Sequence, residues 1–215
     1  MNGGSLRRPA PEPRPQGIKR PQLPGRTRGG ATRLGMTVYI GLLRAVNVGG
    51  SGKIDMIALA ALLSRMGLGD VHTVLQSGNV VFRSDVAEVT PLEVAIERAL
   101  SEQLRLRTDV FVRTLPEWRS ILRQNPFPLE AKTDPAHLVV TLLKRAPEPS
   151  EWRVLERSIP GRERIRGAGR HAYIVYPDGI GTSKLTAAVI ERQLSTRSTS
   201  RNWNTMQKLD QLASS

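Results

Sequence analysis

The stretch RAVNVGGSGKIDM, residues 44–56, places glycines and a lysine directly ahead of a predicted helix. Such a turn exposes backbone amides beside a positive charge, which is the chemistry that holds a phosphate group. The phosphate loop of nucleotide hydrolases, however, requires a glycine where this chain has Asn47 and a hydroxyl where it has Ile54. The glycines are also too closely spaced for a dinucleotide fingerprint. Two interpretations remain: the turn and Lys53 bind a simpler anion, or the turn is structural and Lys53 is solvated.

A similar arrangement recurs in PDGIGTSKL, residues 177–185, where two glycines precede Ser183 and Lys184. If the two segments belong to related halves of the protein, we expect Lys53 and Lys184 to face one cleft. The alternative is that Ser183 caps a helix and Lys184 is a surface residue.

Polar side chains also gather where predicted strands end. Amide, hydroxyl and guanidinium groups at such places bind a ligand or bond to one another. Asn and Ser also suit turns and helix caps, so part of the set can be purely structural. We interpret Trp203 as a packing anchor between domains. The candidate ligand-binding residues are Arg44, Asn47, Lys53, Gln76, Ser77, Asn79, Ser183, Lys184, Arg201, Asn202 and Asn204.

No catalytic set is recognisable in this sequence. Cysteine is absent, which excludes thiolate nucleophiles, disulfides and zinc–cysteine sites. There is no G-x-S-x-G or H-E-x-x-H motif, and the three histidines lie far apart. We therefore predict no metal and no cofactor, we assign no catalytic residue, and an enzyme of unknown reaction stays an alternative.

The formal net charge of +13 would favour a polyanionic partner. The first 35 residues, however, hold eight basic residues and one acid, so the other 180 residues carry only +6. In that remainder Arg162, Arg164 and Arg166 lie on one face of a predicted strand. They either contact phosphate or protect a sheet edge from other strands. Nucleic acid is therefore an alternative partner with weak support.

Residues 1–35 contain six of the fifteen prolines and seven of the nineteen glycines, with almost nothing apolar. Such a segment cannot offset its ordering entropy, so we expect a disordered tail. Either translation begins at Met36 and the tail is a mis-assigned start, or the tail is a nucleic-acid-binding arm. The chain has no signal-peptide pattern and no apolar run long enough to span a bilayer, which predicts a cytoplasmic protein with no membrane partner.

From Met36 onward the predicted elements alternate regularly. Apolar periodicity and capping signals predict a strand at 37–44, a helix at 55–66 capped by Asp55 and ended by Gly67, and a hairpin of strands 71–76 and 79–83. A helix capped by Thr90, with Pro91 and a capping-box Glu93, follows to about Arg105, and then a strand at 108–114. The order is β-α-β-β-α-β.

The second half of the chain repeats this order. We predict a strand at 137–144, a helix capped by Ser150, a hairpin at 162–177, a helix at 183–194, a strand at 197–202 and a terminal helix capped by Asn204. Between the halves, Thr114 and Glu117 form a capping box for a connecting helix that Pro126 and Pro128 stop.

The predicted fold is α+β, with two ferredoxin-like lobes in tandem. Residues 36–113 form the first lobe, residues 114–135 form the connecting helix and Pro-rich linker, and residues 136–215 form the second lobe with its C-terminal helix. The duplication rests on element order, because the two halves share little sequence similarity.

Five segments of the sequence resemble a known family: YIGLLRAVNVGG with the KI that follows at 53–54, VLQSGNVVF, NPFP, YPDGIGTSKL and TRSTSRNWNT. They are similar to the successive signature segments of the bacterial family called domain of unknown function 1697, from about Met36 to Leu212. The resemblance implies a two-lobed α+β fold with ferredoxin-like halves and no established activity. The family usually has isoleucine at Val46, and residues 1–35 have no counterpart in it. All the candidate ligand-binding residues fall on the matching segments.

Taken together, these features favour a protein that binds a small anionic or phosphorylated ligand in a cleft between two lobes. A nucleic-acid-binding module that uses the basic second lobe and tail is one alternative. An enzyme is the other.

Overall fold

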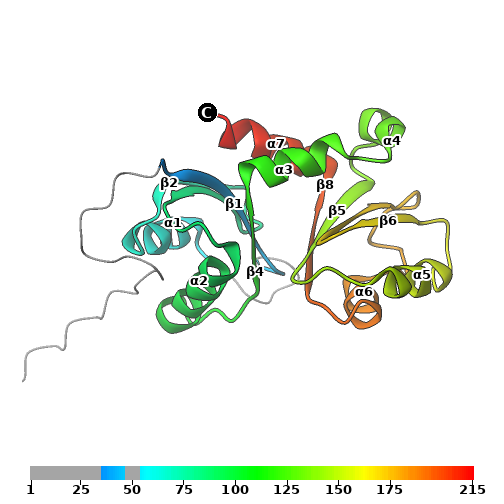
Figure 1. Cartoon of the computed structure of the whole chain (residues 1–215), viewed down its shortest axis with the longest axis horizontal. Helices are drawn as coiled ribbons and strands as arrows, with labels where there is room; N and C mark the ends of the chain where they lie inside the picture. The colour runs from blue at the N-terminus through cyan, green and yellow to red at the C-terminus, as the bar shows by residue number, and fades with distance from the viewer. Residues whose placement is uncertain (1–34, 47–53) are drawn as a thin grey trace, which may run out of the picture.

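The computed structural model describes residues 35–46 and 54–215. Within these ranges the chain forms eight strands and seven helices. The strands make two four-stranded antiparallel sheets, ordered β2-β3-β1-β4 and β6-β7-β5-β8. The two sheets lie side by side, with α3, α4 and α7 on one side of the molecule and α1, α2, α5 and α6 on the other (Figure 1). No helix in the described part of the chain is long and apolar enough to cross a lipid bilayer.

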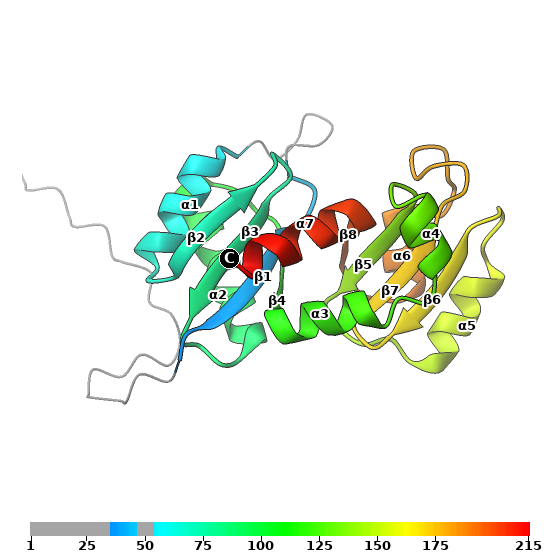
Figure 2. The ribbon, with the colours of Figure 1, turned by 90° about the horizontal axis from the view of Figure 1, so that it is seen from above.

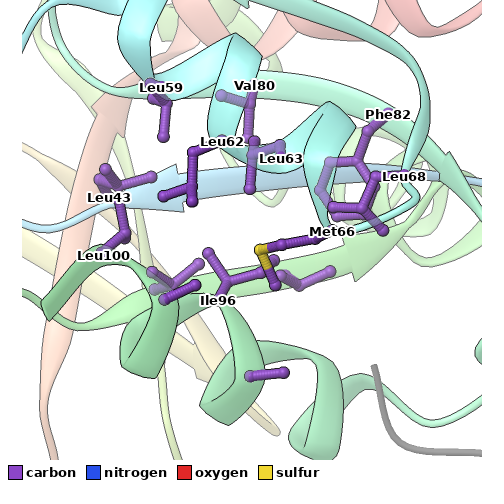
Figure 3. Packing of buried hydrophobic residues seen from close by; sticks show 14 of the residues in the cluster. Leu43, Leu59, Leu62, Leu63, Met66, Leu68, Val80, Phe82, Ile96 and Leu100 are labelled. Atoms are coloured by element: carbon purple, nitrogen blue, oxygen red, sulfur yellow. The ribbon is translucent and has the colours of Figure 1, made fainter. Parts of the chain in front are cut away.

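The first sheet and its two covering helices come from the first half of the chain. Their bounds are β1 (Thr37–Leu43), α1 (Met56–Arg65), β2 (Gly69–Val74), β3 (Asn79–Ser84), α2 (Val89–Leu104) and β4 (Val110–Thr114). Apolar side chains at helical spacing, such as Leu59 and Leu63 on α1 and Ile96 and Leu100 on α2, are fully buried against the sheet (Figure 3). The core that they form includes Tyr39 and Leu43 of β1 and Val80 and Phe82 of β3.

The second sheet repeats this arrangement. Its elements are β5 (Leu138–Leu143), α5 (Pro149–Arg157), β6 (Arg164–Ala168), β7 (His171–Val175), α6 (Ala187–Gln193) and β8 (Ser198–Asn202). Leu155 on α5, Ile190 on α6 and Ile174 on β7 belong to a separate core. In both sheets the last strand lies at an edge, beside the first strand of its half.

Three more helices complete the fold: α3 (Leu115–Arg123), α4 (Pro128–Thr133) and α7 (Trp203–Ala213). Helices α3 and α7 directly follow β4 and β8 and lie side by side over both sheets (Figure 2). Their apolar faces share one core with both sheets, which includes Phe111, Trp118, Leu142 and Trp203. The interpretation of Trp203 as a packing anchor is therefore confirmed.

The predicted capping box at Thr90 is wrong. Helix α2 begins at Val89, after Glu88, whose side chain makes no capping bond. Glu93 is buried and accepts a hydrogen bond from the backbone N–H of Val112, at 2.7 Å. The Glu93 carboxylate therefore binds the backbone of β4 and not the N-terminus of its own helix.

Three other predicted helix starts are also displaced. Helix α6 is capped by Thr186 instead of Ser183, because the Ser183 hydroxyl accepts from the Leu185 N–H in a tight turn. Helix α7 is capped by Asn202 instead of Asn204, because the helix begins as soon as β8 ends. Helix α5 starts at Pro149, which follows its N-cap residue Glu148, and not after Ser150.

The linker between the halves is only partly as predicted. The capping box of Thr114 and Glu117 at the start of α3 is confirmed. Pro128 opens the short helix α4, where it was expected to be a stop signal, because the first turn of a helix tolerates proline. In the first hairpin, β2 ends at Val74 and not at residue 76, since residues 75–78 form the turn.

Candidate functional site

The ends of β1 and β5 are built in the same way. The Leu43 N–H donates to the Gly78 carbonyl of the β2–β3 turn at 2.8 Å, and the Leu143 N–H donates to the Arg170 carbonyl of the β6–β7 turn at 2.9 Å. The next residue in each half, Arg44 or Lys144, donates its backbone N–H to the residue just before β4 or β8. Corresponding positions in the two halves can therefore be identified residue by residue.

Arg201 on β8 reaches out of its own sheet into the first half. Its five guanidinium N–H groups have five neutral acceptors, three of them in the first half. These are Leu43 O at 3.0 Å, Ser77 O at 2.8 Å, Asn79 Oδ1 at 2.6 Å, Thr199 Oγ1 at 3.1 Å and Ser200 O at 2.8 Å. Burial lowers the pKa of Arg201 to about 10. The positive charge is thus held by dipoles, with no carboxylate bonded to it among the described residues.

Arg113 on β4 is the counterpart of Arg201. It pairs with Ile40 of β1 as Arg201 pairs with Val140 of β5. Its Nη2 donates to the Leu143 and Arg170 carbonyls of the second half, at 3.0 Å each. Burial, and then the charge of Arg170, lower the pKa of Arg113 to about 10. Arg113 differs in having a carboxylate, that of Glu93, 3.8 Å from its Nη1.

The side chains of Arg44 and Lys144 also bridge the junction, the region where the two halves of the chain meet. Each reaches from its own half to a helix of the other half. Arg44 makes a two-point ion pair with Glu191 of α6, at 2.9 and 3.1 Å. Lys144 binds Glu93 at 2.7 Å and Glu97 at 2.8 Å, both on α2. Burial raises the pKa of Glu191, but hydrogen bonds from the Ser198 N–H and Arg44 outweigh it and leave the pKa below its usual value. Arg44 is therefore neutralised by a carboxylate, unlike Arg201.

Three carboxylates accept hydrogen bonds from the outward N–H groups at the outer edge of β4. In an antiparallel pair, alternate residues point their N–H groups away from the partner strand. On β4 these are Val110, Val112 and Thr114, because residues 44 and 109 form a hydrogen-bonded pair. The acceptors are Glu97 Oε1 at 2.8 Å, Glu93 Oε1 at 2.7 Å and Glu117 Oε2 at 2.8 Å, in the order of the three donors.

The outer edge of β8 has only one such carboxylate. Its outward N–H groups belong to Ser198, Ser200 and Asn202, because residues 144 and 197 form the hydrogen-bonded pair. The Ser198 N–H donates to Glu191 Oε1 at 2.9 Å. Within the described residues, the Ser200 and Asn202 N–H groups have no acceptor, and both residues are partly exposed. These two donors flank Arg201.

Five of the predicted ligand-binding residues meet at this junction: Arg44, Ser77, Asn79, Arg201 and Asn202. Gln76 is exposed in the same turn, next to Ser77. Asn47 and Lys53 lie outside the described residues. The sequence therefore predicted part of the residues at this junction, and their role in binding a ligand stays a prediction.

Ser183 and Lys184 lie elsewhere. The Ser183 hydroxyl bonds to Glu163, which directly precedes β6, and Lys184 is exposed beside it. Strands β6 and β8 are at opposite edges of the second sheet, three strand spacings or about 14 Å apart. Asn204 is exposed on the first turn of α7. These three residues are therefore not part of the cluster around Arg201.

The sequence analysis did not predict several residues that make the contacts between the two halves. The missed residues are Glu93, Glu97, Arg113, Lys144, Glu191 and Ser200. A usable signal was present for Lys144, which follows the buried strand β5 as Arg44 follows β1. The carboxylates on α2 and α6 gave no local signal, because acidic residues on a helix are usually solvated.

His171 occupies the position of Asn79 in the second half, since each pairs with the corresponding residue of the first strand. Its Nε2 lies 3.2 Å from the Tyr173 hydroxyl, which donates to the Ile121 carbonyl. Burial, and then the charge of Arg113, lower the pKa of His171 to about 4. His171 is therefore neutral at physiological pH.

A family model described as "Protein of unknown function (DUF1697)" matches residues 36–173. The chain belongs to this family. DUF1697 is thus the family that the sequence segments resembled, and it carries no assigned activity. Among curated proteins, none matches the chain.

The DUF1697 chain is also similar to a solved structure, that of the conserved bacterial protein SP0830 from Streptococcus pneumoniae. The TM-score is 0.64 at 21% sequence identity, and the match covers 83% of this chain and 99% of that one. At this identity the likeness shows a shared fold.

The three arginines near β6 of this DUF1697 protein are matched by acids. Arg162 pairs with Asp178, Arg164 with Glu130, and Arg166 with Glu156 at 3.6 Å. Strand β6 is an edge strand. The arrangement supports edge protection and gives no separate support to phosphate contact. In the described part of the chain, no three acidic or histidine side chains are placed to hold a metal ion.

Proposed function

We propose that this protein binds a small anion at the outer edge of β8, at the junction of the two halves. The observation that carries the proposal is the pair of backbone N–H groups at Ser200 and Asn202, which lack an acceptor in the described residues and flank the charged Arg201. The corresponding amides of β4 each bind a carboxylate. An anion at β8 would take the place of those carboxylates.

The electrostatics of the junction support this location. A buried guanidinium that is surrounded by neutral oxygens keeps its full charge in a medium that screens it poorly. Hydrogen bonds from backbone amides to an ionised acceptor contribute roughly 1.5–3 kcal/mol each. Arg44 adds no net charge, because Arg44 and Arg197 are balanced by the carboxylates of Glu191 and Asp109. The attraction therefore centres on Arg201.

The proposal includes the architecture expected from the sequence. Each half has the order β-α-β-β-α-β and places its first and third strands at the centre of its sheet, which is the ferredoxin-like plan. We propose residues 36–113 and 136–215 as the two lobes and 114–135 as the linker. The cytoplasmic location is part of the same proposal, supported by the absence of cysteine.

A proline substitution tests this proposal directly. Ser200→Pro removes the outward N–H while the bonds to β5, which come from neighbouring residues, stay in place, and an edge strand tolerates proline at such a position. Ser200→Ala is the matched control, because it loses the hydroxyl and keeps the N–H.

Binding of inorganic phosphate to the full chain is measured by isothermal titration calorimetry at low salt. We expect the wild type and Ser200→Ala to bind alike and Ser200→Pro to bind about tenfold more weakly, the loss of one hydrogen bond. Absence of phosphate binding by the wild type, or equal binding by Ser200→Pro, would overturn the proposal.

A further inference from the structure

We infer that the ligand at the edge of β8 is a molecule with two separate anionic groups about 7 Å apart, called a dianion below whatever the charge of each group. This inference rests on the proposed function and names the chemical class of the ligand. It follows from comparing, position by position, how the two halves close the outer edges of β4 and β8.

The first acidic group takes the place of the Glu93 carboxylate. On α2, Glu93 stands four residues before Glu97, which binds the first outward amide of β4. On α6, Glu191 binds the first outward amide of β8, and the residue four positions before it is Ala187. The Ser200 N–H, the counterpart of the Val112 N–H, therefore lacks the side chain that would accept from it.

The second acidic group takes the place of the Glu117 carboxylate. Glu117 is the third residue of α3 and accepts from the Thr114 N–H in a capping box. The third residue of α7 is Thr205, whose N–H and hydroxyl bond to the Asn202 side chain. Thr205 is too short to reach back to the Asn202 N–H as a glutamate does. That amide also lies at the N-terminus of an eleven-residue helix, where a negative charge is favoured.

The spacing and the charge of the site define the class of ligand. Two outward amides separated by one residue on a strand are about 7 Å apart. Arg201 lies between them in sequence and supplies a positive charge that no carboxylate neutralises in the described residues. A linear dicarboxylate or a compact bisphosphate presents two anionic groups at such a spacing, whereas a monoanion reaches only one amide.

The experiment compares ligands by calorimetry on the full chain. The probes are acetate, inorganic phosphate, the linear dicarboxylates from malonate to pimelate, and propane-1,3-diol bisphosphate. We expect one dianion to bind at least tenfold more tightly than acetate and phosphate, because it engages both amides. The preferred member of the set tells whether the acidic groups are carboxylates or phosphates.

Two substitutions place a glutamate of the protein itself beside the Ser200 and Asn202 N–H groups. Ala187→Glu and Thr205→Glu should each lower the affinity for the preferred dianion at least tenfold, because each closes one amide. Ala187→Gln and Thr205→Ala are the controls and should bind within threefold of the wild type.

The outcomes separate the inference from the proposed function. Equal affinity for phosphate, acetate and every dianion would overturn the inference that the ligand has two anionic groups, and the proposal of anion binding would stand. Wild-type affinity in both glutamate variants would also overturn it. If no probe binds, the proposed function fails, and the inference fails with it.

Discussion

Asp109 and Arg197 form an ion pair of 3.1 Å across the junction, although they occupy the same position in the two halves. Each directly precedes the last strand of its half and accepts the backbone N–H of Arg44 or Lys144. At the other end of the junction, Trp118 Nε1 donates to the Met206 carbonyl at 3.1 Å. These are the fourth residues of α3 and α7. Contacts between equivalent positions at both ends place a local twofold axis alongside β4 and β8.

The ion pair on this axis should show coupling that depends on charge. Asp109→Arg and Arg197→Asp should each destabilise the protein, and the double variant should recover part of the loss because the pair is restored with reversed polarity. Since both side chains are partly exposed, we expect a coupling free energy of about 0.5–1 kcal/mol. Urea unfolding of the four proteins measures it. Strictly additive effects would show that the pair contributes nothing.

Arg201 should be essential to the fold of the junction. Arg201→Met removes all five donors, which leaves the carbonyls of Leu43 and Ser77 without this partner, and we expect a loss of about 2–4 kcal/mol. Arg201→Lys should recover little, because an ammonium cannot reproduce the planar fork. Arg162→Met, at an exposed ion pair, is the control and should change the free energy of unfolding by less than about 0.5 kcal/mol. A similar small change in Arg201→Met would contradict this role.

His171 should make stability fall in mild acid. Its pKa is about 4 in the folded protein and near 6.5 unfolded, so between these values the unfolded chain binds more protons. The stabilisation is fully present above about pH 6.5 and is lost as the pH falls toward 4. It amounts to something on the order of 2–3 kcal/mol.

The variant His171→Asn isolates this contribution, because asparagine is the residue at the equivalent position 79. Chemical unfolding at several pH values should give a flatter profile for the variant between pH 4 and 6.5. Carboxylates such as Glu191, whose pKa is lowered in the fold, also lose stabilisation in acid, so the comparison is of the difference between the two proteins. Parallel profiles would contradict the assignment.

Thr205→Glu should stabilise the protein in the absence of ligand. It completes a capping box with Asn202 on α7, as Glu117 does with Thr114 on α3, and we expect a gain of about 0.5–1 kcal/mol. Urea unfolding checks the gain. Thr205→Lys is the opposing control and should destabilise, because it puts a positive charge at the start of the helix. A glutamate variant no more stable than the wild type would show that the Asn202 N–H is not open to a side chain.

The sequence by itself determined the local elements of this protein. The Asp55 cap and the left-handed Gly67 bound α1 as predicted, and the Thr114–Glu117 box starts α3. These features depend on neighbours within a few residues, so short-range patterns are sufficient to identify them. The same patterns placed Arg44, Ser77, Asn79 and Arg201 at strand ends and turns.

Only the tertiary structure decided what these side chains contact. Arg201 is 122 residues from Asn79 and 158 from Leu43 in sequence, and Arg44 is 147 from Glu191. Glu93 has the spacing of a capping box, yet it binds β4, because a buried N–H on an edge strand requires an acceptor more strongly than an exposed helix end does. Burial decides which N–H group the Glu93 carboxylate binds, and a local sequence pattern does not show which groups are buried. For the same reason, the two amides of β8 that set the proposed site became apparent only when the edges of the two sheets were compared.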